Sequence, residues 1–154
     1  MKLIAILASA LITIPCFAQN ATQAEVFPGS DVKTQLEALV QKAKASGSSG
    51  ATLGDYKSHA IKLSVRTASG SAEVHAHFDD IFFVTQGQAM LTTGGTVMNG
   101  QTGDDGETKG SSIENGKPQK ISEGDVVHIP AGTPHQLILA PGTVFSAIVI
   151  KVKE

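Results

Sequence analysis

The feature that most constrains this chain is a series of short segments in which apolar and polar residues alternate, separated by glycine- and proline-rich turns. From about residue 57 onward these segments include HAIKLSVR (59–66), AEVHAH (72–77) and HQLILA (135–140). Alternation with a period of two places successive side chains on opposite faces of a β-strand. Many short strands joined by such turns predict an all-β fold, either a β-sandwich or a jelly roll.

One segment ahead of this region has the periodicity of a helix. Five apolar side chains of residues 31–46 share one face at helical spacing: Val32, Leu36, Leu39, Val40 and Ala43. Ser30 or Asp31 can cap the start of this helix, and Gly47 can end it. We expect a single N-terminal helix packed on the outside of the domain. The glycine- and serine-rich stretch that follows, SGSSGATLGD (46–55), is expected to be a flexible connector.

The first residues have the pattern of a secretory signal. Lys2 precedes an apolar centre, and the small residues Cys16 and Ala18 precede Gln19, which predicts cleavage after Ala18. We therefore divide the chain into a signal peptide (1–18), a leader with helix and linker (19–56) and a β-barrel domain (57–154). The mature chain is expected to be periplasmic or secreted, with no membrane span. Because Cys16 is the only cysteine, any metal site must use histidine, carboxylate and water.

Composition excludes several functions. The net charge is −2 and no basic patch appears, so a nucleic acid is not expected as a partner. The mature chain has no cysteine nucleophile, and no serine lies in a nucleophile elbow. The segment GGTVMNG (94–100) lacks the lysine and the helix that a phosphate-binding loop needs.

Two of the five histidines lie one residue apart in EVHAHFDDIFFVTQG (73–87). On a strand, His75 and His77 would share a face, with roughly 7 Å between their positions along the backbone. Two imidazoles in this arrangement can share one metal ion. Three acids lie close enough in sequence to contribute: Glu73, Asp79 and Asp80. The alternative is a pair of exposed histidines on a sheet face.

A second histidine segment, GDVVHIPAGTPHQLIL (124–139), makes the sequence resemble the cupin superfamily. The second cupin motif is matched at Gly124, Pro130, Gly132 and His135, although Leu139 replaces the asparagine that usually ends it. The first cupin motif is matched by Gly70, His75, His77, Asp80 and Gly87. It departs from the usual pattern in two ways: aspartate replaces glutamate, and only two residues separate His77 from Asp80.

The resemblance implies a double-stranded β-helix, or jelly-roll barrel, in which both motifs face one interior. It implies that His75, His77, an acid and His135 bind one divalent transition-metal ion: Fe, Mn, Zn, Ni, Cu or Co. We favour Asp80 as the acid, because six residues separate it from Gly87 as the motif requires. Asp79 and Glu73 remain alternatives because each shares the strand phase of His75.

The resemblance also implies a small-molecule ligand. We expect a small metal-dependent enzyme, dioxygenase-like or isomerase- or lyase-like, in which His128 serves as a catalytic proton carrier. His59 is a weaker candidate for that role. The alternatives are a non-catalytic binder of metal or small ligand in the cell envelope, and a structural barrel with a vestigial site. A homodimer is expected, and the glycine-rich excursion at 94–119 is either a lid or a tolerated insertion.

Overall fold

The structure, a computed structural model, describes residues 23–154. The segment interpreted as a signal peptide, 1–18, lies outside the described residues. No helix in the described part of the chain is long and apolar enough to span a membrane. Within residues 23–154 the elements, in chain order, are α1 (Gly29–Ser46), β1 (Ser48–Asp55), β2 (His59–Arg66), β3 (Ala72–His75), β4 (Phe78–Gln86), β5 (Gln88–Thr93), β6 (Thr96–Met98), β7 (Gln101–Thr102), β8 (Glu107–Gly110), β9 (Ser112–Glu114), β10 (Lys117–Ser122), β11 (Val126–Ile129), β12 (His135–Ile138) and β13 (Phe145–Lys153).

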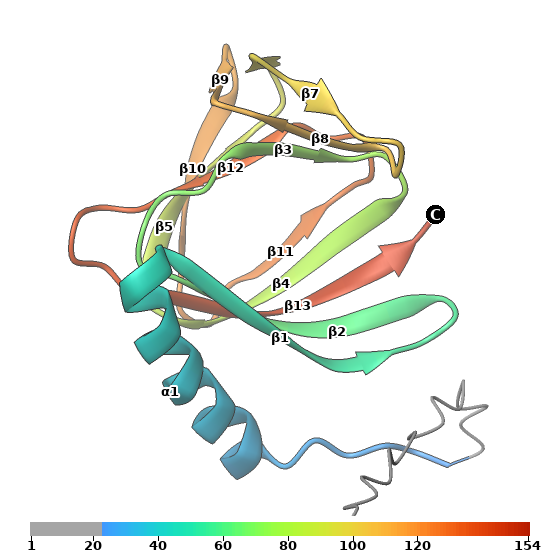
Figure 1. The fold of residues 1–154 in the computed structure, drawn as a ribbon, viewed down its shortest axis with the longest axis vertical. Helices are drawn as coiled ribbons and strands as arrows, with labels where there is room; N and C mark the ends of the chain where they lie inside the picture. The colour runs from blue at the N-terminus through green and yellow to red at the C-terminus, as the bar shows by residue number, and fades with distance from the viewer. Residues whose placement is uncertain (1–22) are drawn as a thin grey trace, which may run out of the picture.

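Two antiparallel sheets face each other and enclose the interior of the domain (Figure 1). One sheet has the order β1-β2-β13-β4-β11, and the other has the order β10-β5-β12-β3-β8-β7. Strands β6 and β9 form a separate two-stranded ribbon. The prediction of an all-β jelly-roll barrel with one N-terminal helix is confirmed.

Helix α1 lies on the outside of the barrel, against β1 and β2 (Figure 1). Its buried residues Leu39 and Ala43 pack on Leu63 and Val65 of β2. Gly47 ends the helix with φ 82°, and its N–H donates to the carbonyl of Ala43, as the sequence predicts. The start differs from the prediction: Pro28 holds the N-cap position, and neither Ser30 nor Asp31 makes a side-chain cap.

The segment expected to be a flexible connector is instead strand β1. It pairs with β2 along its length, from Ser48 opposite Arg66 to Asp55 opposite Ala60. Side chains of β1, including Leu53, pack into the apolar cluster beneath α1. Backbone pairing and this contact overcome the low strand preference of a glycine- and serine-rich sequence, because strand preference depends strongly on context.

Strand β2 separates two different environments. Leu63 and Val65, on its outer face, are buried beneath α1. Lys62, Ser64 and Arg66, on its inner face, line the space between the two sheets. A second apolar cluster fills much of the rest of the interior; its members are Phe82, Val84, Ala89, Leu91, Ile121, Ile129, Leu137, Leu139, Phe145, Ala147 and Val149.

Candidate metal centre

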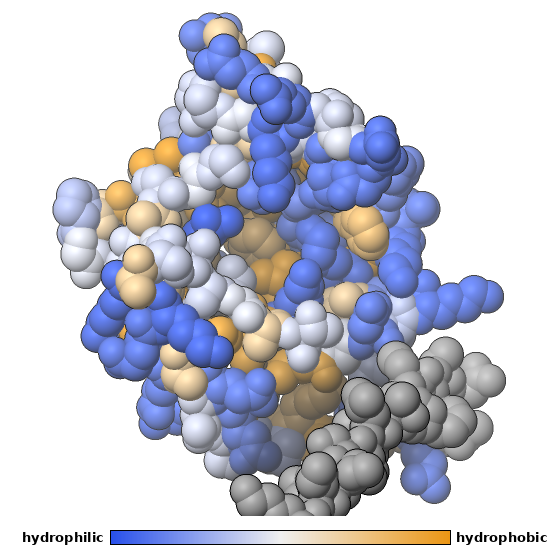
Figure 2. Space-filling view, in the orientation of Figure 1, coloured by the Kyte–Doolittle hydropathy of each residue, from blue (hydrophilic) through white to orange (hydrophobic). Residues whose placement is uncertain are grey.

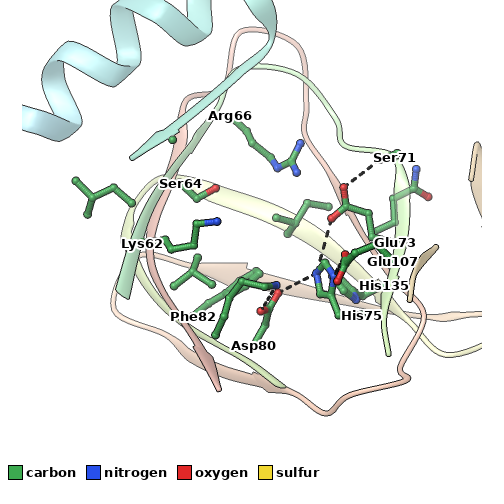
Figure 3. A pocket seen from close by; sticks show the side chains of 16 residues that line it. Lys62, Ser64, Arg66, Ser71, Glu73, His75, Asp80, Phe82, Glu107 and His135 are labelled. Carbon is green, nitrogen blue, oxygen red and sulfur yellow. Dashed lines mark hydrogen bonds and ion pairs between the residues drawn. The ribbon is translucent and has the colours of Figure 1, made fainter. Parts of the chain in front are cut away.

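A cavity of about 410 Å³ lies between the sheets and is lined by side chains from β2, β3, β4, β8, β12 and β13. Figure 2 shows a hollow at this place, with hydrophilic residues around its rim and hydrophobic residues deeper inside. The volume lies within the range typical of small-molecule sites. Figure 3 shows its two chemically distinct walls: Lys62, Ser64 and Arg66 on one side, and a cluster of histidines and acids on the other.

The cluster contains Glu73, His75 and His135, each of which offers a ligand atom within 4.8 Å of those of the other two. The alternation of β3 turns Glu73 and His75 to the same face, and β12 places His135 directly opposite Glu73 in the sheet register. The two imidazole rings have centroids 5.0 Å apart. Residues from the two predicted motifs therefore meet inside the barrel.

Each ring is held by a hydrogen bond at Nδ1. Nδ1 of His75 contacts the carboxylate of Glu107 on β8, and Nδ1 of His135 lies 3.0 Å from the carbonyl oxygen of Thr133. Both partners are acceptors, so each Nδ1 is the donor, and the Nε2 of each ring in its neutral form has the lone pair that a metal ion needs. Histidines that bind metals are oriented in this way.

Nε2 of His75 faces two carboxylates: Oε2 of Glu73 at 4.0 Å and Oδ2 of Asp80 at 3.3 Å. Asp80 is 4% exposed and is not a member of the group within 4.8 Å. Its Oδ1 instead accepts a 2.6 Å hydrogen bond from Nζ of Lys151, the residue opposite it on β13. Glu73 accepts a hydrogen bond from the hydroxyl of Ser71 and has no contact with a cation among the described residues other than His75.

The electrostatic environment favours neutral His135 and ionised Asp80. Burial lowers the pKa of His135. Burial alone would raise the pKa of Asp80, but hydrogen bonding to His75 and the charge of Lys151 bring it below its usual value. Burial opposes the charged form of His75, yet the hydrogen bond to Asp80 raises the pKa of His75 overall. A cation placed between His75 and Asp80 would interact with a carboxylate that is already ionised.

The structure does not bring His77 into this group. Strand β3 ends at His75, and Ala76 and His77 form the turn into β4, where the side chain of His77 is exposed. Its ring lies beside Gly106. The two-residue spacer between His77 and Asp80 explains this placement, since the chain must reverse immediately after β3 and the alternation stops there.

His128 and Asp79 lie outside the cavity. Nε2 of His128 is 2.9 Å from Oδ2 of Asp79, and the His128 side chain is 56% exposed. Asp79 also accepts a hydrogen bond from the backbone N–H of Ala131. His59 stacks on Tyr56, with ring centroids 4.8 Å apart, and neither lines the cavity. The pair of His128 and Asp79 joins β11 to β4 on the outer surface.

Three residues of the site were not anticipated from the sequence. Glu107 lies in the glycine-rich excursion, which has no periodicity from which its direction could be read. Lys151 shares the strand phase of the buried Ala147 and Val149, so a cation at a core position was a usable signal. Arg66 lies on the polar face of the alternating segment HAIKLSVR (59–66), and alternation alone does not tell whether that face points inward.

The residues present fit a divalent transition metal. Two imidazole nitrogens and one or two carboxylates are ligands used by Zn, Fe, Mn, Co, Ni and Cu. The hydrogen bonds at Nδ1 supply the surrounding support that such ligands have.

No family model and no curated protein matches the sequence significantly. Solved structures do match. BH2720 of Bacillus halodurans has a TM-score of 0.58 at 14% identity, over 89% of this chain and 86% of that one. An uncharacterised double-stranded β-helix protein of Klebsiella pneumoniae has a TM-score of 0.58 at 13% identity, over 87% and 88%.

The DMSP lyase DddQ of Ruegeria pomeroyi is similar over 68% of this chain, with a TM-score of 0.47 and 20% identity. The chain spans 46% of the length of that lyase. The two matches with TM-scores of 0.58 show a common fold, and at identities this low the activity must be argued from the site itself. The chain has a double-stranded β-helix fold, the fold that the resemblance to the cupin motifs predicts.

Proposed function

We propose that the protein is a small metal-dependent enzyme that binds one divalent transition-metal ion through His75, His135 and Glu73. The observation that carries the proposal is the orientation of the two imidazoles. Both Nδ1 atoms are hydrogen-bonded to acceptors, and the two rings lie with Glu73 in one cluster at the wall of a cavity large enough for a small organic molecule.

When bound, such an ion would act as a Lewis acid that polarises an oxygen atom of the ligand. The surrounding residues orient the metal ligands and control their protonation. Glu107 and the Thr133 carbonyl fix the tautomers of the two histidines, and Ser71 orients the carboxylate of Glu73. Asp80, kept ionised by Lys151, can accept a hydrogen bond from a hydroxyl group of the ligand.

The ligand set can be tested by metal analysis. Purified chain, reconstituted separately with Mn, Fe, Co, Ni, Cu and Zn, should retain about one equivalent of at least one of these metals. His75→Ala and His135→Ala should each lose it. His77→Ala should retain it, because His77 is exposed in the turn after β3, and it serves as the matched histidine control.

The acid is identified by a second pair of variants. Glu73→Gln should weaken metal binding more than Asp80→Asn, because Asp80 is already paired with Lys151 at 2.6 Å. The reverse order would restore Asp80 as the acidic ligand. Retention of less than about a tenth of an equivalent of every metal would overturn the proposal. Turnover that needs metal and is lost in His135→Ala would distinguish an enzyme from a non-catalytic binder.

A further inference from the structure

We propose that the cavity takes a small organic monocarboxylate, with its carboxylate held by Arg66, Ser64 and Lys62 and its apolar body against Phe82 and Val149. The inference rests on the proposed function and names the substrate class of the same site. It comes from the wall opposite the histidines, which the metal centre does not use (Figure 3).

Arg66 is the only arginine in the sequence, and it lies half-buried on the inner face of β2, lining the cavity. Among residues 23–154 it has no ion pair within 4.0 Å, and the same holds for Lys62 on the same face. Ser64, between them in the strand alternation, makes no side-chain hydrogen bond within that range. A guanidinium presents paired N–H donors that match the two oxygens of a carboxylate.

The formal charge of the residues that line the cavity is compatible with a bound anion. Three cations, Lys62, Arg66 and Lys151, and three acids, Glu73, Asp80 and Glu107, line it, so the formal sum is zero with neutral histidines. Lys151 is already paired with Asp80, and Glu107 contacts His75. A divalent ion at the histidines would bring the total to +2, and a ligand carboxylate would reduce this excess.

The surface between the two polar walls is apolar. In the sheet register, Lys62 lies opposite Val149, and Val149 lies opposite Phe82. Leu137 of β12 also lines the cavity. A ligand reaching from Arg66 to the histidine cluster therefore crosses a hydrocarbon surface, which favours an organic acid with an apolar body over an inorganic anion.

The position of the guanidinium depends on Gly70. A Cβ at residue 70 would lie 2.8 Å from Nη1 and 3.0 Å from Cζ of Arg66. Gly70 does not have a positive φ, so its backbone accepts alanine. Gly70→Ala should therefore displace the guanidinium without changing the charge of the cavity.

The test uses the full mature chain loaded with Zn²⁺ and three acids, each paired with its neutral amide: phenylacetate, cinnamate and hexanoate. Isothermal titration calorimetry measures the affinities. At least one acid should bind about tenfold more tightly than its amide, because the site loses charge-assisted hydrogen bonds when the ligand is neutral. Added salt should weaken binding of the acid and leave the amide unchanged.

Three variants test whether the tighter binding of acids depends on the side chains of β2 that line the cavity. Arg66→Gln should weaken binding of the acid about tenfold, and Gly70→Ala should weaken it severalfold. Lys44→Gln makes the same change in net charge on the exposed surface of α1 and should have no effect. Zn²⁺ affinity should stay within about threefold in all three, which also shows that each variant folds.

If no acid binds more tightly than its amide, or if Arg66→Gln and Gly70→Ala both bind the acid as well as Lys44→Gln does, the inference is overturned. Its failure differs from that of the metal proposal. Zn²⁺ binding without selectivity for acids would refute the carboxylate site alone. Binding of acids that depends on Arg66 in a chain that retains no metal would refute the metal centre alone.

Discussion

Replacement of Lys151 by methionine removes the cation that holds Asp80 inside the barrel. Nζ of Lys151 lies 2.6 Å from Oδ1 of Asp80, and the two side chains are 18% and 5% exposed. Removal of one partner from a buried ion pair costs about 3–5 kcal/mol, since the other charge stays buried and uncompensated. The partial exposure of Lys151 reduces this cost, so we expect a loss of about 2–3 kcal/mol in the free energy of unfolding.

The assay is urea unfolding of metal-free protein at pH 7, followed by circular dichroism. In a parallel thermal unfolding experiment, a loss of this size should lower the melting temperature by about 10 °C in a domain of this length. Lys153→Met is the matched control, because Lys153 lies on the same strand, is 43% exposed and is 3.8 Å from Asp55. Its loss should stay below about 1 kcal/mol. Equal losses in the two variants would refute the reasoning that the Lys151–Asp80 pair holds a buried charge.

Three further outcomes are expected. Glu107→Gln should weaken metal binding about 10–100-fold, because it weakens the hydrogen bond that orients His75; calorimetry that gives an unchanged affinity would contradict this role. Leu39→Ala should cost about 2–3 kcal/mol in urea unfolding, because Leu39 is 4% exposed beneath the helix, and it should leave metal affinity unchanged, whereas loss of metal binding would show that the helix supports the site. N-terminal sequencing of exported protein should begin at Gln19, and a chain that still begins at Met1 would contradict signal cleavage.

The sequence predicts most of the fold, because most of the long strands have alternating or apolar sequences; β1, which is rich in glycine and serine, is the exception. The alternation in HAIKLSVR gives β2 with the bounds observed, His59–Arg66. The resemblance to the two cupin motifs predicts that His75 and His135 lie inside the barrel, where the structure has them. It does not place His77 correctly relative to them, since alternation holds only while the strand continues, and β3 ends at His75. The shortened spacer before Asp80 was the sign of an early turn.

The rest of the site depends on pairing between distant strands. Lys151 lies beside Asp80 because β13 and β4 pair in that register, and Glu107 reaches His75 because β8 pairs with β3. Register of this kind is set by the packing of the whole sheet rather than by the local sequence. Alternation also cannot say which face of a strand points inward. In β2 the apolar face is the outer one, because α1 covers it.

Because α1 covers the outer face of β2, the two faces of this strand have separate roles: the outer face packs in an apolar cluster, and the inner face lines the cavity. Burial of Leu63 and Val65 beneath α1 stabilises the barrel. The alternate positions, Lys62, Ser64 and Arg66, line the cavity and belong to neither apolar cluster. Substitutions at these three positions, in evolution or by design, should therefore change ligand specificity with little effect on the stability of the fold.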